Sequence, residues 1–464
     1  MTVIGSAFGG LVYIVVPWGS NLDDFDVSIS GAVRSLQYTH NHTSLSTWQE
    51  QIGISSTGTN VNTSLYPPWG ELVSGKYVMT LQTSVLLTVT DPSSVMDYWD
   101  TVVDAEDTLL GYPDLTWRAE VGRAERMVVD VQISAGWMHS GYPWMAYDSV
   151  SDEMVDVPHL LAEGEWGPYH ELGHNHQYQP FVVMDSTEVS CNFFSVFVQE
   201  MVNGIPSFGT ESIGCEQEIR EYMAVADYEG TLAGDVWMHL NFFMLLKHSF
   251  GWGVIKDTLS SYVDGTDSTD YSGYDSYERV DPLLWKLSVA TGRNLVNYSR
   301  AWDYPLTTEG AAAIKALGLP SWDYDAALRD LETQINPTRE CYTPVGEKYT
   351  LVQYEDPLLG NNTNMWHYTT YRGVLNTTTT GRTCQRWDSQ FPHDHSYGPE
   401  SKECRGTVDN NYCRTNGEDR PWCYTTDENV RWEFCDLPVC EKMTLPATKA
   451  SCSTFTITSG YLPE

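Results

Sequence analysis

Residues 170–177 read His170-Glu171-Leu172-Gly173-His174-Asn175-His176-Gln177. The first five positions match H-E-x-x-H, which on a helix places two imidazoles one turn apart on the same face. His170 and His174 are therefore predicted to bind one metal ion. Glu171, one position further round the helix, is placed to hold the water bound to that metal. The pattern predicts a zinc hydrolase.

Glu188 is the best candidate for the third protein ligand that a catalytic zinc usually has. Apolar residues follow it at helical spacing, and Asp185 with Glu188 fits a capping box, so we expect Glu188 in the first turn of a second helix. The alternative is that Glu188 only caps its own helix. Two rival ligands remain. Cys191 is more simply half of a disulfide with Cys215, and His176 faces elsewhere because it follows His174 by two positions.

The predicted metal determines the chemistry. Zinc lowers the pKa of its bound water from about 15.7 toward 7 and polarises the scissile carbonyl. Glu171 is then expected to act as the general base that takes the water proton and delivers it to the leaving amine. Another group must stabilise the oxyanion of the tetrahedral intermediate. Tyr142, Tyr169 and His139 are the candidates, and spacing does not choose among them.

The region from His170 to Phe194 closely resembles the enhancin-like gluzincins, a family of metallopeptidases. Further blocks agree in order: Phe8-Gly9-Gly10-Leu11-Val12-Tyr13-Ile14, Pro68-Trp69-Gly70-Glu71-Leu72, Asp130-Val131-Gln132-Ile133-Ser134-Ala135-Gly136, Gly141-Tyr142-Pro143 and Thr291-Gly292-Arg293-Asn294-Leu295. The resemblance implies His170, His174 and Glu188 as zinc ligands and Glu171 as general base. It also implies a secreted peptidase that acts on heavily O-glycosylated proteins such as mucins. The family usually has more β-structure before the Phe8 block, so we expect a truncated amino terminus.

Seven of the ten cysteines fall between Cys341 and Cys440, so cross-links are expected to stabilise this part of the chain. This region resembles a kringle domain in the following motifs: Tyr371-Arg372-Gly373, Cys384-Gln385-Arg386-Trp387, Pro392-His393-Asp394-His395, Asn411-Tyr412-Cys413-Arg414, Pro421-Trp422-Cys423-Tyr424 and Arg431-Trp432-Glu433-Phe434-Cys435-Asp436. The resemblance implies disulfides Cys384–Cys423 and Cys413–Cys435, and a bond from Cys440 to an earlier cysteine. The partners of Cys341, Cys404 and Cys452 stay open.

Many kringles bind lysine side chains in an aromatic trough between anionic and cationic groups. The matching positions here are Trp422, Tyr424 and Trp432 for the trough and Arg431 for the cationic group. The anionic pair of the family is missing, and Glu418 or Asp419 is expected to substitute for it. The alternative is that these aromatic residues form the packed centre of a small disulfide domain. A lysine-bearing protein partner is the corresponding expectation, with the kringle as an attachment module.

Composition favours an extracellular, secreted protein. The chain has ten cysteines, mostly in one module, and cytosolic proteins rarely use cysteine this way. Five N-x-S/T acceptors, at Asn41, Asn62, Asn297, Asn361 and Asn376, agree with this location. The run Leu11–Val16 is short and no Lys or Arg precedes it, so it is interpreted as a buried strand, and a signal peptide is expected upstream of this chain. The charge of −36, from 26 basic and 62 acidic groups, argues against nucleic acid as a partner. No apolar run is long enough for a transmembrane segment.

The predicted fold class is α+β: a β-rich amino-terminal lobe and a mainly α-helical gluzincin-type catalytic lobe, then a small disulfide-rich kringle. Residues 8–90 are rich in β-formers, whereas helical spacing recurs in Asp91–Leu110, Gln217–Ala226, Val236–Phe250 and Ala326–Gln334. Asn336-Pro337-Thr338 is the expected interdomain break. The predicted domains are residues 1–335 (metallopeptidase), 341–440 (kringle) and 441–464 (tail).

Two functions from different classes fit these observations. The first is a secreted zinc endopeptidase that cleaves O-glycosylated proteins, with the kringle as a targeting module. The second is a noncatalytic adhesion or recognition protein that binds glycoproteins through a retained peptidase fold and the kringle. The first is favoured because every residue required for hydrolysis is present.

Overall fold

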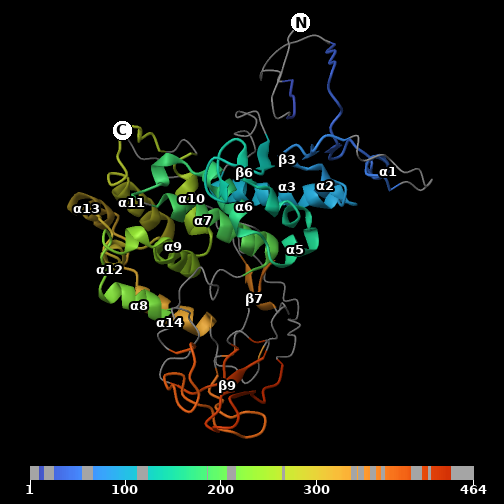
Figure 1. Cartoon of the computed structure of the whole chain (residues 1–464). Helices are drawn as coiled ribbons and strands as arrows, with labels where there is room; N and C mark the ends of the chain where they lie inside the picture. The colour runs from blue at the N-terminus through green and yellow to red at the C-terminus, as the bar shows by residue number, and fades with distance from the viewer. Residues whose placement is uncertain are drawn as a thin grey trace.

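The computed structural model describes residues 10–14, 26–54, 66–111, 124–184, 186–205, 216–263, 267–335, 342, 350–355, 362–366, 371, 373–398, 410–415, 418 and 420–439. Figure 1 shows a sheet flanked by helices, a group of helices beside it and a module near the carboxy terminus that has few regular elements. None of the helices in these ranges is long and apolar enough to cross a membrane.

Six strands form one mixed sheet: β1 (Gln37–Thr39), β2 (Trp69–Val73), β3 (Tyr77–Gln82), β4 (Glu125–Asp130), β5 (Met138–His139) and β6 (Trp144–Tyr147). Their order is β1-β2-β3-β4-β6-β5. β4 runs parallel to both β3 and β6, whereas β5 is antiparallel to β6. β5 therefore lies at one edge of the sheet, where its outer backbone groups have no partner among the described strands.

The long helix α3 (Pro92–Leu110) packs on this sheet. Asp91 caps its first turn by accepting a hydrogen bond from the backbone N–H of Ser94 at 3.3 Å, and Pro92 occupies the position where no N–H is needed. Gly111 ends the helix with a φ of 82°, a conformation that favours glycine. The ring of Trp99 stacks on Tyr77 of β3 with centroids 5.4 Å apart.

Three shorter helices belong to the sheet lobe: α1 (Leu45–Gln51), α2 (Thr83–Leu86) and α5 (Val157–Ala162). The 3-10 turns of the described residues are Asp148–Val150, Glu153–Val155, Gln179–Phe181 and Leu232–Gly234. Two central helices follow, α6 (Trp166–His176) and α7 (Thr187–Val198), and α7 continues into a π-helical turn at Gln199–Asn203.

The helical lobe contains α8 (Glu216–Ala224), α9 (Val236–Phe250), α10 (Gly253–Ser260), α11 (Val280–Thr291), α12 (Val296–Ala301), α13 (Thr308–Ala316) and α14 (Tyr324–Ile335). α9 is buried at every position from His239 to Lys247, because apolar residues cover most of its circumference. It is capped by Asp235, which accepts from the N–H of Met238 at 2.9 Å.

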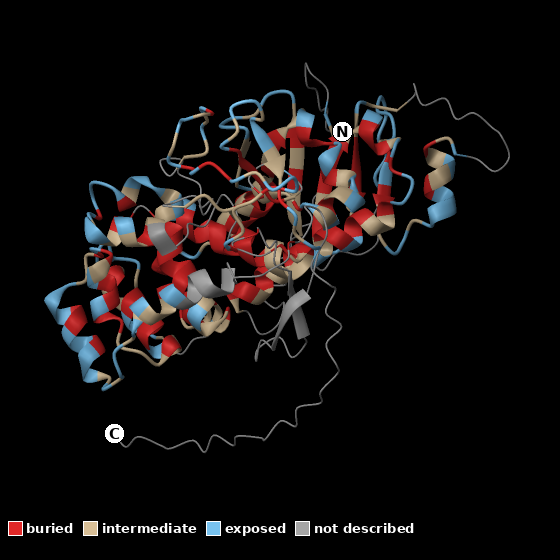
Figure 2. Ribbon diagram, turned by 90° about the horizontal axis from the view of Figure 1, so that it is seen from below, coloured by how far each residue is buried: buried red, intermediate tan, exposed pale blue. Residues whose placement is uncertain are grey.

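Two apolar cores meet at α6 and α7. One core joins the sheet, α3 and the α6 residues Tyr169 and Leu172, and the other joins α7 to α9, α10 and α11. Figure 2 shows the buried residues running through the interior of both lobes, with exposed residues on the outer faces. Side chains at the α6–α7 junction are therefore held from both sides.

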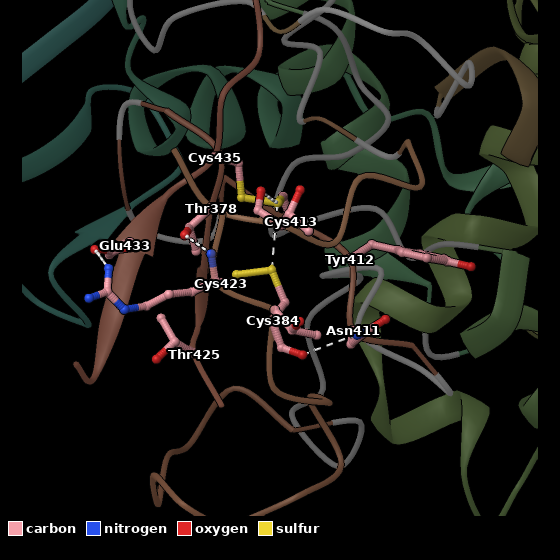
Figure 3. Close-up of a disulfide and its surroundings, with 12 residues drawn as sticks. Thr378, Cys384, Asn411, Tyr412, Cys413, Cys423, Thr425, Glu433 and Cys435 are labelled. Carbon is pink, nitrogen blue, oxygen red and sulfur yellow. Dashed lines mark hydrogen bonds and ion pairs between the residues drawn. A yellow bond between two sulfur atoms is a disulfide. The ribbon is translucent and has the colours of Figure 1, made fainter. Parts of the chain in front are cut away.

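The carboxy-terminal module is small and cross-linked. Its strands β9 (Trp422–Tyr424) and β10 (Trp432–Phe434) are antiparallel, and a further pair, β7 (Thr350–Glu355) and β8 (Asn362–Trp366), precedes them. Disulfides join Cys384 to Cys423 and Cys413 to Cys435, the pairs that the kringle resemblance implies. Figure 3 shows the two bonds next to each other, with the sulfurs of Cys384 and Cys413 3.8 Å apart.

The fold class predicted from the sequence is confirmed, with a sheet-containing lobe, a helical lobe and a disulfide-rich module. The expected helices at Asp91–Leu110 and Val236–Phe250 appear with nearly the same bounds. The buried strand expected at Leu11–Val16 is wrong for the described residues, because residues 10–14 form no strand and Val12, Tyr13 and Ile14 are about half exposed. The expected interdomain break at Asn336-Pro337-Thr338 lies outside the described residues.

Candidate metal centre

The site begins with the close packing of α6 on α7, which depends on Gly173. A Cβ at this position would lie 2.5 Å from the carbonyl oxygen of Cys191 and 3.2 Å from the Cβ of Phe194. No real side chain fits at such distances, so only glycine lets the two helices approach this closely. The glycine inside H-E-x-x-H thereby brings the first turn of α7 next to the two histidines.

His170, His174 and Glu188 meet at this junction. The Nε2 atoms of His170 and His174 lie 3.1 and 3.4 Å from Oε2 of Glu188. For donors about 2.0–2.1 Å from a tetrahedral zinc, the expected donor–donor distance is about 3.3 Å. These two distances fit one shared zinc ion, and the candidate ligand atoms all lie within 4.8 Å of one another. Two nitrogens and one carboxylate oxygen match a catalytic donor set. Glu188 stands in the first turn of α7, as expected.

The other nitrogen of each imidazole has an amide partner. Nδ1 of His170 lies 2.7 Å from Oδ1 of Asn192, and Nδ1 of His174 lies 2.9 Å from Oε1 of Gln177. In this arrangement Nδ1–H donates to the amide oxygen, so that Nε2 of each ring carries a lone pair toward Glu188. The two amides thus set the tautomer that metal binding requires.

Both amide side chains are themselves anchored on α7. Asn192 donates to the carbonyl oxygen of Glu188 at 2.7 Å, and Gln177 donates to the carbonyl of Thr187 and to the hydroxyl of Ser190. Sequence reasoning missed Asn192 and Gln177. A signal was present, since Asn192 follows Glu188 by one helical turn and Gln177 follows His174 by three residues.

Glu171 is buried beside the two histidines. Burial raises the pKa of its carboxyl, while the charges of His170, His174 and His139 act in the opposite direction. A buried carboxylate with a raised pKa accepts a proton more readily than one in water, which is the property that a general base needs.

Cys191 also lies at the junction, with Sγ 3.5 Å from Nδ1 of His170. It is a free, buried cysteine, so the disulfide with Cys215 that the sequence suggested is wrong for Cys191, while Cys215 itself lies outside the described residues. Burial raises the pKa of this thiol well above its usual range. Because metals bind the thiolate, Cys191 is a weaker donor here than Glu188.

His176, the other rival ligand, points away from the site. Its Nε2 lies 3.0 Å from Oδ1 of Asp107 and its Nδ1 lies 2.9 Å from Oε2 of Glu106, both on α3. Burial lowers the pKa of His176, but the bonds to Asp107 and Glu106 outweigh burial and raise it to about 10. His176 therefore ties α6 to α3. Asp185, which the sequence placed in a capping box, lies outside the described residues, and Ser186 precedes α7 without a side-chain cap.

The three oxyanion candidates have different surroundings. Tyr169 is fully buried and its hydroxyl contacts Tyr98 and Asn203, so it does not face a substrate. His139 has both ring nitrogens engaged, with Ser134 at 2.8 Å and the carbonyl of Ser140 at 2.9 Å. Tyr142 is 44% exposed. Of the three, Tyr142 has the most accessible side chain.

Only some of the residues predicted to form the lysine-binding site of the kringle lie close together at an accessible surface. Trp422 and Tyr424 are buried in the centre of the module, and only Trp432 is substantially exposed. Arg431 lies over the Tyr424 ring and reaches Asp394 at 3.3 Å. Glu418 is exposed, while Asp419 and Cys440 lie outside the described residues. Lysine binding stays a prediction.

Comparison with known proteins identifies the two regions. Residues 31–303 match the family model "Peptidase M60, enhancin and enhancin-like", and residues 365–440 match the kringle domain. Curated relatives include TRPM8 channel-associated factor 2 of Bos taurus, 32% identical over 324 residues, and a TRPM8 channel-associated factor homolog of Xenopus laevis, 33% identical over 327 residues. These alignments cover 69% and 68% of this chain but 33% of each relative, so the chain spans about a third of their length.

Solved structures support the fold. A mutant of a functionally unknown conserved protein from Bacillus anthracis aligns with a TM-score of 0.52 at 17% identity, covering 63% of this chain and 58% of that one. A metallopeptidase in complex with Tn antigen aligns with a TM-score of 0.50 at 14% identity, covering 65% and 58%. With a family model that matches more than half of its length, this chain belongs to the enhancin and enhancin-like peptidase family and carries a kringle domain after the peptidase region.

Proposed function

We propose that this protein is an extracellular zinc-dependent endopeptidase that hydrolyses peptide bonds in O-glycosylated, mucin-like proteins, with the kringle as a targeting module. The observation that carries the proposal is the group of three donor atoms on α6 and α7, spaced for one tetrahedral zinc, with the buried Glu171 beside it. When bound, zinc supplies a bound water whose pKa is near 7 and a Lewis acid for the scissile carbonyl.

The residues of the chain perform the remaining tasks. Glu171 takes a proton from the attacking water and passes it to the leaving nitrogen, which its raised pKa favours. Asn192 and Gln177 keep the two imidazoles in the tautomer that binds metal. The outer edge of β5, which has no partner among the described strands and lies beside α6, is suited to an extended peptide that pairs with it as an added strand.

The substrate class rests on similarity. The enhancin-like family is associated with O-glycosylated proteins, and a solved metallopeptidase of the same fold is described in complex with Tn antigen. The extracellular location is supported by the two disulfides of the kringle, which persist in oxidising compartments.

A second candidate is a noncatalytic recognition protein that binds glycoproteins through the peptidase fold and the kringle. The relatives named TRPM8 channel-associated factors favour it, because their names describe association with a channel rather than catalysis. In that case a bound metal would stabilise the packing of α6 on α7 and take no part in catalysis.

Cleavage of an O-glycosylated mucin separates the two candidates. The experiment compares the zinc-loaded protein, the protein treated with a chelator and the Glu171→Gln variant. Glu163→Gln is the matched control because Glu163 is exposed and lies close to Glu171 in sequence. Mass spectrometry locates each cut relative to the glycans. The proposal requires cleavage that needs both zinc and Glu171 and survives in Glu163→Gln. One equivalent of bound zinc without cleavage of glycosylated or bare protein would favour the recognition protein.

A further inference from the structure

The carboxylate of Glu171 lies in the middle of a stripe on α6. Gly167, Glu171 and Asn175 follow one another at four-residue spacing and therefore share one face of the helix. The segment Met138–Tyr142, which we call the wall segment, lies against this stripe. At the beginning of the wall segment, Sδ of Met138 would lie 2.9 Å from a Cβ on Gly167, so Met138 packs directly on the helix backbone. In the middle, the strand β5, which ends at His139, packs on α6.

The other end of the wall segment is held by Asn175. Its Oδ1 accepts a hydrogen bond from the backbone N–H of Gly141 at 3.0 Å, and its Nδ2 donates to the carbonyl oxygen of the same residue at 3.0 Å. Nδ2 also donates to Oε2 of Glu125 on β4 at 3.1 Å. One amide therefore satisfies both backbone groups of Gly141 and ties the segment to α6 and to the sheet at once.

This attachment fixes the backbone conformation as well as the position. Gly141 has a φ of +132°, in the region that side chains of L-residues rarely adopt. The residue that follows, Tyr142, is 44% exposed, and the residues that precede it form the edge strand β5. The Asn175 side chain, one residue after His174, thus holds the segment that carries the exposed Tyr142 ring and the strand β5, whose outer edge has no partner among the described strands.

We propose that Asn175 is a positioning residue of the active site, whose amide fixes the wall segment so that an extended substrate lying along β5 presents its scissile bond to Glu171 and the metal. This inference rests on the proposed peptidase function. Asn175 touches neither the metal nor the reacting atoms, and it acts through Gly141. Misplacing a substrate-binding element by about 1 Å can reduce the rate about 100-fold, so removal of the amide should impair turnover without removing the metal.

The test compares Asn175→Ala with Asn294→Ala in the full chain. Asn294 is a matched control because its Oδ1 also accepts a backbone hydrogen bond, from Val296 at 3.0 Å, but at the start of α12. We expect kcat/KM for an O-glycosylated peptide to fall about 100-fold in Asn175→Ala, with zinc affinity within twofold of wild type and faster amide hydrogen exchange in residues 138–142. Asn294→Ala should lower the Tm by about as much as Asn175→Ala does, because each variant loses one side-chain acceptor of a backbone hydrogen bond, but Asn294→Ala should keep full turnover.

Asn175→Asp provides a second variant if Asn175→Ala does not fold. It keeps the acceptor for Gly141 N–H but brings a carboxylate against the Gly141 carbonyl and Glu125, so turnover should again fall. Turnover within twofold of wild type in the folded Asn175 variants, or a loss of zinc that accounts for the lost turnover, would overturn the positioning role and leave the peptidase function intact. If the zinc-loaded wild type cleaves no peptide, the proposed function fails and the positioning role fails with it.

Discussion

Nδ1 of His170 lies 2.7 Å from Oδ1 of Asn192, and Asn192 stands one helical turn after Glu188 on α7. One side chain thus connects two of the three candidate ligands, because its amide nitrogen also donates to the carbonyl of Glu188. The orientation of the His170 ring is therefore set by the same helix that supplies the carboxylate.

Asn192→Ala should weaken zinc binding by about 10–100-fold, because the His170 ring loses the acceptor that fixes its tautomer. Asn192→Asp keeps an acceptor at this position and should retain more of the affinity. Competition with a fluorescent chelator measures both variants against wild type. Equal zinc affinity in wild type and Asn192→Ala would show that the ring is held by packing alone.

Gly173→Ala should separate α6 from α7, since the added methyl group would meet the carbonyl of Cys191 at 2.5 Å. We expect a loss of about 1–3 kcal/mol in the free energy of unfolding and weaker zinc binding, because Glu188 would move away from the histidines. Gly234→Ala is the control, since no atom lies within 4 Å of a Cβ at that position. Urea unfolding and zinc titration measure the two effects. Unchanged zinc affinity in Gly173→Ala would contradict the link between helix spacing and the site.

His239 on α9 should make the helical lobe less stable in acid. Burial lowers its pKa to about 3, whereas the unfolded chain has a value near 6.5. Because the pKa is lower in the folded state, the unfolded state binds a proton on His239 at a higher pH than the folded state does. The contribution of neutral His239 to the free energy of unfolding is therefore complete above about pH 6.5 and is lost as the pH falls toward 3. Between these two pH values, the free energy of unfolding should fall by at most about 1.4 kcal/mol per pH unit for one such group.

His239→Gln removes this titration and isolates it from the other groups that change charge in the same range. Urea unfolding followed by tryptophan fluorescence at pH 7, 6, 5 and 4 should show that the variant loses stability less steeply than wild type. Parallel pH dependences in the two proteins would mean that His239 does not contribute.

The meeting of the three candidate ligands could be predicted from the sequence because helical spacing is a local property. His170 and His174 share a face through the i, i+4 rule alone, and the apolar pattern after Glu188 placed this residue in a first turn. The residues that support them come from other elements. Glu106 and Asp107 of α3, which hold His176, and Gly141, which binds Asn175, are distant in sequence, and only the folded backbone shows that they meet. The free state of Cys191 was missed because counting cysteines cannot show which of them are close enough to pair.

A buried ion pair beside α7 offers a test of how that helix is anchored. Lys247 of α9 contacts Glu200 in the π-helical turn that follows α7, and Nε1 of Trp252 donates to the other carboxylate oxygen of Glu200 at 2.6 Å. Both charged side chains are almost fully buried. Glu200→Gln leaves the Lys247 ammonium without its carboxylate, and breaking a buried pair in this way typically costs about 3–5 kcal/mol.

The double variant Glu200→Leu/Lys247→Met, which removes both charges, should therefore be closer to wild type in stability than Glu200→Gln alone, because no uncompensated charge stays buried. Thermal unfolding of the three proteins gives the comparison. Zinc affinity should follow the order of stability, since α7 carries Glu188 at its other end. A Glu200→Gln protein as stable as wild type would show that water or another group replaces the lost charge and that this pair does not anchor the helix.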